Sequence, residues 1–247
     1  MNNTTKTVIV TGASSGLGFA IANAYLKRGY HVIGNASTQA SLDKAADNLG
    51  NPAGFHGVAG DISLSATSEH LFGYAEQHGL RVDILIINAG IFIAKPLTDY
   101  AEVDITRMLD INLRGFIYPA QAAAKHMMQH GGGHIVAVTA AIGMQPNANL
   151  PALLPVLTKG GLNQAVKALA IELAPHNIMV NAVAPGVIAT PMHADNLQAR
   201  EALQSMAPVQ RIGEPQDVAE AVLYLTDASF VTGIILPVDG GSTAGVW

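Results

Sequence analysis

Short apolar runs alternate with longer segments of helical period along the whole chain. The apolar runs cover residues 7–10, 32–33, 84–87, 134–138, 178–183 and 234–238, and the helical segments cover roughly 16–28, 39–49, 64–78, 101–129, 156–174 and 216–227. Apolarity within each run is continuous, which is typical of strands covered on both faces. The pattern predicts an α/β fold with one doubly wound parallel sheet of about seven strands and helices on both faces.

The length and the even texture of the sequence favour a single domain over residues 1–247. Wound α/β sheets of this size commonly form one core, and the chain contains no repeat and no low-complexity linker. Residues 189–212 interrupt the alternation of strands and helices and contain Pro191, His193, Asp195 and Pro208. Because they follow a strand's carboxyl end, we expect them to form a substrate lid.

The composition of the chain indicates which classes of binding partner to expect. Hydrophobic residues make up 49% of the chain and charged residues only 13%, which favours a homo-oligomer that hides apolar surface between subunits. A net charge of −5 gives no reason to expect nucleic acid or an anionic membrane surface, so a small-molecule substrate is the expected partner. The first strand begins near residue 6, and no apolar run approaches the ~18 residues of a membrane span. We therefore expect a soluble, cytoplasmic protein, and the absence of cysteine excludes disulfides and cysteine metal sites.

The strongest local motif is Thr-Gly-Ala-Ser-Ser-Gly-Leu-Gly at residues 11–18, where the first strand ends and a helix begins. Gly12 permits a tight turn, Gly16 allows backbone N–H groups to approach a pyrophosphate, and Gly18 allows close packing of helix on strand. Taken alone, such a motif is also compatible with a glycine turn that binds nothing.

Further motifs follow in order along the chain. They are Gly60-Asp61-Ile62, Asn88-Ala89-Gly90, Asp-Ile-Asn112-Leu-Arg-Gly, Lys159-Gly-Gly, Pro185-Gly186-Val-Ile188-Ala-Thr190-Pro and Val-Asp-Gly-Gly at 238–241. Together with the glycine motif they resemble the short-chain dehydrogenase/reductase family. The resemblance implies a single-domain Rossmann fold, a homotetramer, and NAD(P)-dependent hydride transfer.

The resemblance also implies a cofactor site. Asp61 and Ile62 would flank the adenine, the segment from Asn88 to Gly90 would line the cofactor, and Ile188 and Thr190 would hold the nicotinamide carboxamide. The full set of expected cofactor-binding residues is Gly12, Ser14, Ser15, Gly16, Leu17, Gly18, Ser37, Asp61, Ile62, Asn88, Ala89, Gly90, Lys159, Pro185, Gly186, Ile188 and Thr190. The family's usual asparagine before Asn88 is Ile87 here, which puts the detail of the sheet in question more than cofactor binding.

The end of the second strand bears on cofactor choice. An acidic residue there would bind the ribose hydroxyls of NAD and repel the 2′-phosphate of NADP, but residues 31–38 contain none. Neither this turn nor the glycine motif carries Arg or Lys, so Ser37 and Thr38 could hydrogen-bond a phosphate without neutralising it. The sequence slightly favours NADP(H) over NAD(H).

The resemblance further implies four catalytic positions, of which two are retained. Lys159 matches the family's lysine, which binds the ribose and lowers the pKa of a tyrosine, and Asn112 matches the asparagine that holds a relay water. The tyrosine position, four residues before the lysine, is Pro155, and the serine position is Ala140. The neighbouring Thr139 should point to the opposite face of its strand. Proline in the first turn of a helix is structurally harmless, but it has no proton to give.

Loss of both hydroxyls should make reduction of an ordinary ketone very slow, because a positioned acid contributes ~10² to 10⁴ in rate and an oxyanion donor ~10² to 10³. Three alternatives follow. In the first, the acceptor is an iminium or an activated carbonyl. In the second, the proton comes from His193, from Asp195 or from a water held by Lys159 and Asn112. In the third, hydride transfer is abandoned, and the protein either catalyses a non-redox step such as a cyclisation or isomerisation or is a catalytically inactive nucleotide-binding partner.

Three histidines and a set of apolar residues are further candidates for a site. His126, His130 and His134 have a spacing compatible with a metal site, but no Glu or Cys accompanies them and we expect no metal. A set of apolar side chains is expected to line a substrate pocket: Met144, Leu150, Leu153, Leu154 and Met192.

Overall fold

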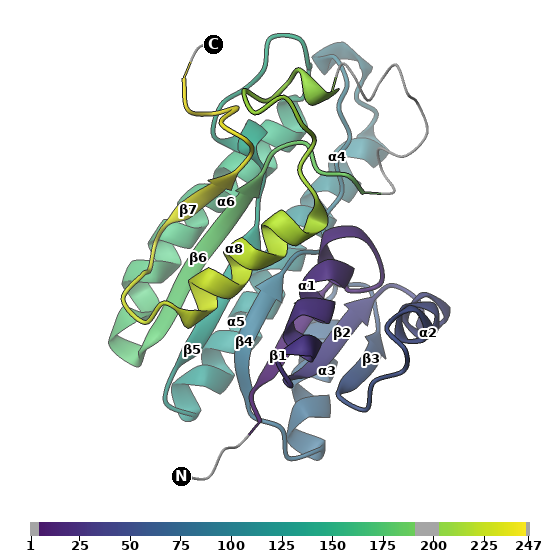
Figure 1. Ribbon diagram of the computed structural model, residues 1–247, viewed down its shortest axis with the longest axis vertical. Helices are drawn as coiled ribbons and strands as arrows, with labels where there is room; N and C mark the ends of the chain where they lie inside the picture. Colours follow the sequence, from purple (N-terminus) through teal and green to yellow (C-terminus); the bar gives the residue numbers. More distant parts are fainter. Residues whose placement is uncertain (1–4, 191–202, 246–247) are drawn as a thin grey trace.

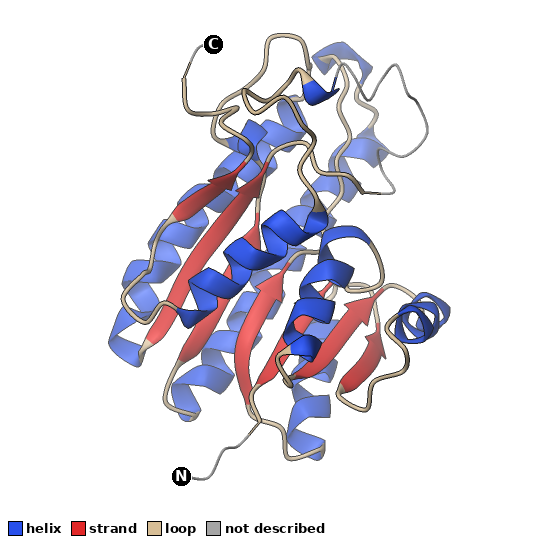
Figure 2. Ribbon diagram, in the orientation of Figure 1, coloured by secondary structure: helices blue, strands red, loops and turns tan. Residues whose placement is uncertain are grey.

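The computed structural model describes residues 5–190 and 203–245. Its centre is a seven-stranded sheet in the order β3-β2-β1-β4-β5-β6-β7, in which every neighbouring pair is parallel (Figures 1 and 2). The strands are β1 (Thr7–Thr11), β2 (His31–Ala36), β3 (Phe55–Ala59), β4 (Val82–Ile87), β5 (Gly133–Val138), β6 (Ile178–Pro185) and β7 (Ile235–Val238). This confirms the predicted doubly wound fold.

Helices cover both faces of the sheet. They are α1 (Gly16–Lys27), α2 (Gln39–Asn48), α3 (Ser65–Gln77), α4 (Glu102–Leu109), α5 (Gly115–Gln129), α6 (Leu153–Leu173) and α8 (Pro215–Asp227). Helices α1 and α8 pack on each other and on one face, and α3, α5 and α6 enclose a second core on the other face (Figure 1). Side chains of β1 such as Val8 and Ile9 point alternately into the two cores, so this central strand is fully buried.

Strand β2 is longer than the predicted run 32–33, and three other elements differ more in kind. Strand β3 has no counterpart among the predicted runs, because its sequence Phe-His-Gly-Val-Ala is short and interrupted by a polar residue and a glycine. The helix predicted over 101–129 is divided into α4 and α5 by a π-helical turn, η2 (Asp110–Arg114). Helix α6 begins at Leu153, three residues earlier than predicted. At Ile87 the sheet is regular, since this residue pairs with Ala137 of β5.

Half of the predicted lid, residues 191–202 with Met192, His193 and Asp195, lies outside the described residues. Its described end packs on the turn after β7, where Ser242 Oγ donates to the Met206 carbonyl (3.0 Å) and the Val209 N–H donates to the Gly240 carbonyl (3.3 Å). No helix in residues 5–190 or 203–245 is long and apolar enough to cross a membrane.

Candidate active site

The carboxyl ends of β1 and β4 are joined by a small hydrogen-bond network. Thr11 Oγ1 accepts from the backbone N–H groups of Asn88 and Ala89, each at 3.0 Å, and Asn88 Nδ2 donates to the carbonyls of Thr11 (2.9 Å) and Gly12 (3.3 Å). These bonds fix the loop after β4 against the glycine loop after β1. Thr11 was part of the quoted motif but was not among the predicted site residues; its role depends on a partner 77 positions away.

The glycine loop leaves room for a ligand at the start of α1. Gly12 and Gly16 have φ values of 68° and 54°, and a β-carbon on Gly18 would overlap the Gly12 carbonyl oxygen. Ser15 is the N-cap of α1, but its side chain makes no capping hydrogen bond. The first backbone N–H groups of the helix are therefore not occupied by a capping side chain. A helix N-terminus in this state fits a pyrophosphate. Ser14 and Leu17, also predicted to bind the cofactor, lie in the same turn, partly buried.

The ends of β2 and β3 lie beside this loop. Asn35 is buried, with 1% of its surface exposed, and its Nδ2 donates to the carbonyls of Val58 and Gly60, both at 3.1 Å. Asn35 therefore stabilises the sheet edge, whereas Ser37 is exposed. Thr38 caps α2 by accepting from the Ser41 N–H (3.3 Å).

Asp61 and Ile62 follow β3 on the same edge of the sheet. Asp61 Oδ1 accepts from the Ser63 N–H (2.9 Å) and from the Ser63 hydroxyl (2.7 Å), which folds the turn back on itself. Ile62 is 6% exposed and packs into the core. This is the turn that the family resemblance places beside the adenine.

Other predicted cofactor-binding residues lie at the end of β6. Pro185 is the last residue of β6, and the Gly186 N–H donates to the Val238 carbonyl at 3.0 Å. Ile188 bridges to Gly213 and is 3% exposed. The Thr190 side chain lies 3.6 Å from the position of a β-carbon on Gly16, so this segment crosses to the glycine loop.

Lys159 and Asn112 converge below Gly90. A β-carbon on Gly90 would lie 3.1 Å from both Lys159 Nζ and Asn112 Oδ1. Lys159 Nζ donates to the carbonyl of Val138, the last residue of β5, at 3.0 Å. Burial lowers the pKa of Lys159 to about 8. The two retained residues thus meet although they come from α6 and η2.

The π-helical turn η2 places Asn112, which is 2% exposed. Its Oδ1 accepts from the Ile91 N–H (2.9 Å), and its Nδ2 donates to the Ile91 carbonyl (3.0 Å) and to Thr158 Oγ1 (3.2 Å). Thr158 in turn donates to the Leu154 carbonyl (2.9 Å). Thr158 therefore links the first turn of α6 to Asn112. Sequence reasoning missed it, because nothing in its local sequence shows that its hydroxyl faces another helix.

Pro155 lies one helical turn before Lys159 in α6, and Ala140 lies two residues after Val138, whose carbonyl accepts from Lys159 Nζ. Pro155 is buried at the third position of α6, and the first bond of this helix runs from the Val156 N–H to the Ala152 carbonyl at 3.0 Å. Proline here displaces no helical hydrogen bond, as expected. Ala140 precedes the short helix η3 (Ala141–Gly143) in extended conformation. Thr139, beside it, donates its hydroxyl to the Val183 carbonyl (3.2 Å) and is 4% exposed.

The apolar side chains that were predicted to line a substrate pocket differ in their exposure. Met144 and Leu153 are exposed, at 42% and 47%, whereas Leu154 is buried against the fold. Leu150 is half-buried in the loop that leads to α6.

The histidine group lies elsewhere. His126 Nε2 accepts from the Val82 N–H (3.1 Å), and its ring stacks on His130 with centroids 4.1 Å apart. Among the described residues, no three His, Asp or Glu side chains come together in the way a metal site needs. His134 is on β5, at the opposite end of the sheet from the glycine loop.

Known proteins resemble the chain over nearly its full length. Residues 12–243 match the family model described as enoyl-(acyl carrier protein) reductase. The L-rhamnose 1-dehydrogenase (NAD(P)(+)) of Azotobacter vinelandii is 36% identical over 247 residues, covering 96% of each chain. The crystal structure of 3-ketoacyl-(acyl-carrier-protein) reductase from Brucella melitensis complexed with NADH is 30% identical, with a TM-score of 0.89 over 96% of this chain and 98% of that one. The structure entitled ElxO with NADP bound is 27% identical, with a TM-score of 0.92 over 98% of this chain and 100% of that one.

The parallel sheet order, the glycine loop at the start of α1, and the meeting of Lys159 with Asn112 agree with these matches. The chain therefore belongs to the short-chain dehydrogenase/reductase family, whose members are NAD(P)-dependent oxidoreductases.

Proposed function

We propose that this protein is an atypical NAD(P)-dependent reductase that transfers hydride to an activated small molecule, either an iminium or an activated carbonyl. The observation that carries the proposal is the combination of an open cofactor cradle with Pro155 and Ala140 beside Lys159. The first supports hydride transfer, and the second removes the proton and the hydrogen bond that an ordinary ketone needs.

The cofactor's contribution, when it is bound, is the hydride. The chain's own residues do the rest. The N-terminus of α1 and the glycines hold the pyrophosphate, and the Thr11–Asn88 network keeps the two loops in register. Lys159 supplies a positive charge at the floor of the site, fixed by the Val138 carbonyl.

The nearby threonine hydroxyls do not replace the missing tyrosine. Thr139 donates to the Val183 carbonyl, and Thr158 donates to the Leu154 carbonyl while accepting from Asn112. A hydroxyl held in this way would have to break a buried hydrogen bond before it could protonate an alkoxide. An iminium needs no such proton, because hydride addition yields a neutral amine directly.

The test is oxidation of NADPH and NADH, followed by absorbance, with a matched pair of cyclic imines and the corresponding ketones. We expect turnover of imines or activated carbonyls and rates near background for simple ketones. Lys159→Met should reduce the turnover and weaken cofactor binding, whereas Lys44→Met, an exposed control in α2, should change neither. Ketone reduction as fast as imine reduction would refute the proposal.

A non-redox role on the same fold, as a cyclase, an isomerase or an inactive nucleotide-binding partner, is the competing function. It is favoured by the same loss of hydroxyls. Binding of NAD(P)(H) without any change in nicotinamide absorbance across the panel would support it, and failure to bind either nucleotide at millimolar concentration would remove the reductase function.

We further propose a slight preference for NADP(H). Ser37 is exposed at the end of β2, Asn35 is turned into the sheet, and no carboxylate of this turn could repel a 2′-phosphate. Relatives are recorded with NADH, with NADP or with both in their names. Ser37→Asp should lower the affinity for NADPH at least ~10-fold and leave that for NADH unchanged or higher, as measured by fluorescence titration.

The homotetramer that the family resemblance implies is likewise a proposal. Helices α5 and α6 expose large apolar side chains on their outer surfaces: Ile117 (54%), Met128 (42%), Leu157 (57%) and Ile171 (80%). Residues 117 and 128 are three helical turns apart and therefore share one face. Ile171→Glu should reduce the assembly to smaller species in sedimentation velocity, and an unchanged sedimentation coefficient would exclude this surface.

A further inference from the structure

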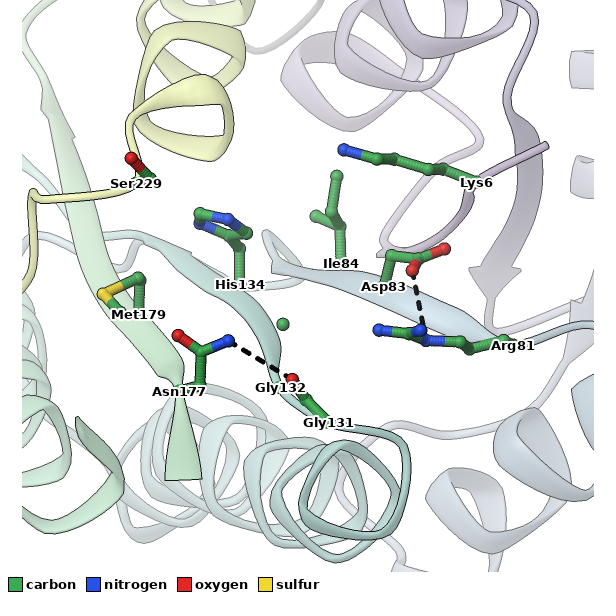
Figure 3. Close-up of a pocket in the computed structure, with 11 residues that line it drawn as sticks. Lys6, Arg81, Asp83, Ile84, Gly131, Gly132, His134, Asn177, Met179 and Ser229 are labelled. Carbon is green, nitrogen blue, oxygen red and sulfur yellow. Dashed lines mark hydrogen bonds and ion pairs between the residues drawn. The ribbon is translucent and has the colours of Figure 1, made fainter. Parts of the chain in front are cut away.

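A polar pocket lies at the amino ends of the central strands, at the opposite end of the sheet from the candidate active site (Figure 3). It encloses about 230 Å³. Five segments far apart in sequence meet there: the residue before β1, the start of β4, the α5–β5 turn, the start of β6 and the turn after α8. Its polar lining consists of Lys6, Arg81, Asp83, His134, Asn177 and Ser229.

The Asp83 carboxylate in this pocket is already engaged. Asp83 Oδ2 accepts from the Thr7 N–H (2.9 Å), and its Oδ1 pairs with Arg81 Nε (3.3 Å). The nearest further carboxylate, Asp227, is paired with Arg28 at 2.8 Å. Both carboxylates therefore already have partners within the fold.

Donors, in contrast, remain available. Arg81 contacts Asp83 through Nε alone, which leaves both terminal NH₂ groups of the guanidinium without a partner among the described residues. The ammonium of Lys6 and the hydroxyl of Ser229 also have no hydrogen bond or ion pair within residues 5–190 and 203–245. In Figure 3 the Lys6 and Arg81 side chains approach the pocket from opposite sides of Asp83.

His134 adds a second, independent observation. It borders the pocket from β5, and its Nδ1 is buried without a hydrogen-bond partner. Buried polar atoms in folded proteins nearly always have partners, so an orphaned one beside a cavity indicates a missing group. The unpaired Lys6 ammonium, the terminal NH₂ groups of Arg81, the Ser229 hydroxyl and the unpaired His134 nitrogen together match a ligand that is negatively charged and rich in oxygen.

We propose that this pocket binds a small oxyanion, either inorganic phosphate or a phosphate monoester. Arg81 would hold two phosphate oxygens through its terminal NH₂ groups, Lys6 would neutralise charge from the other side, and a protonated phosphate oxygen could donate to His134. Because the pocket joins segments that separate on unfolding, occupancy stabilises the folded chain and does not take part in hydride transfer. The proposal is independent of the proposed reductase activity.

Binding of inorganic phosphate to the intact protein tests this inference, by isothermal titration calorimetry and thermal unfolding at constant ionic strength set with NaCl. We expect saturable binding and a rise in Tm with phosphate that chloride does not reproduce. Lys6→Gln and Arg81→Gln should each weaken phosphate binding at least ~10-fold, whereas Lys44→Gln, which removes an equal charge from exposed α2, should leave it unchanged. Glycerol phosphate in a parallel titration distinguishes the two ligand sources, since equal affinity indicates a monoester site and binding of phosphate alone indicates the free ion.

Both variants should fold, because Lys6 has no partner to lose, the Arg81 side chain is 53% exposed, and Asp83 keeps its bond from the Thr7 N–H. The nucleotide site could also bind phosphate, so the same titration is repeated with Gly18→Ala, where that site is disrupted. A phosphate-dependent shift of the His134 ring resonances in NMR spectra gives a readout at the pocket itself. The inference is overturned if phosphate acts no differently from chloride, or if both pocket variants bind phosphate as tightly as the wild type.

Discussion

The double substitution Pro155→Tyr with Ala140→Ser should convert the protein into a carbonyl reductase. Position 155 lies one helical turn before Lys159, so a side chain there is an i, i+4 neighbour of the lysine. Lys159 Nζ is anchored at Val138, two residues before Ala140. A tyrosine and a serine at these positions would therefore stand beside the retained cation.

The size of the effect follows from what is restored. A positioned proton donor is worth ~10² to 10⁴ in rate and an oxyanion hydrogen bond a further ~10² to 10³. Because the two groups act on the same oxygen, their effects are not additive, and we expect kcat/KM for a simple ketone to rise at least ~100-fold. Loss of the proline should cost ~0.4 to 1 kcal/mol, since its position precedes the first helical hydrogen bond, from Val156, and a larger side chain at this buried position a further ~1 to 3 kcal/mol.

The assay is steady-state NADPH oxidation with a ketone panel, alongside both single variants and a cofactor titration. Pro155→Tyr alone should recover much of the activity, and Ala140→Ser alone little, because the alkoxide would still lack its proton. A double variant that folds and binds cofactor like the parent but reduces no ketone would show that residues 155 and 140 do not face the reacting carbonyl.

Four further variants probe the site and its surroundings. Lys159→Met should stabilise the ligand-free protein at pH 7 by up to ~3 kcal/mol, since burial lowers the pKa of the lysine from its unfolded value to about 8. This difference in the free energy of unfolding should shrink as the pH rises from 8 to about 10.4, because the unfolded lysine there binds a proton that the folded one does not. An equal difference between variant and wild type at pH 7 and pH 10 in denaturant unfolding would contradict this. Gly18→Ala should abolish nucleotide binding in a fluorescence titration, because its β-carbon would overlap the Gly12 carbonyl, whereas Gly161→Ala, with nothing within 4 Å, should gain ~0.5 to 1 kcal/mol in urea unfolding. Asn112→Leu leaves two backbone groups unpaired and should cost ~2 to 4 kcal/mol in the same measurement, and a loss below 1 kcal/mol would mean that water replaces the amide.

Local sequence predicted the fold because burial on both faces of a parallel strand leaves a direct mark, continuous apolarity, at each position. The exception shows the limit of that rule. Strand β3 lies at the edge of the sheet and pairs with β2 alone, so its residues need not be uniformly apolar, and its sequence carries no such mark. The π-helical turn at Asn112 also escaped prediction, since the shift of one residue in hydrogen bonding responds to contacts with Ile91 and Thr158.

The candidate site shows the same division. By itself the sequence determined which chemistry-bearing side chains exist: the glycine loop, Lys159 and Asn112, with proline and alanine at positions 155 and 140. The tertiary structure decided which of them meet and which are already engaged, turning Asn35 into the sheet and bringing Lys159 and Asn112 together under Gly90. The reason is physical: residue type fixes what a group can donate or accept, while burial and partners distant in sequence fix whether it is free to do so.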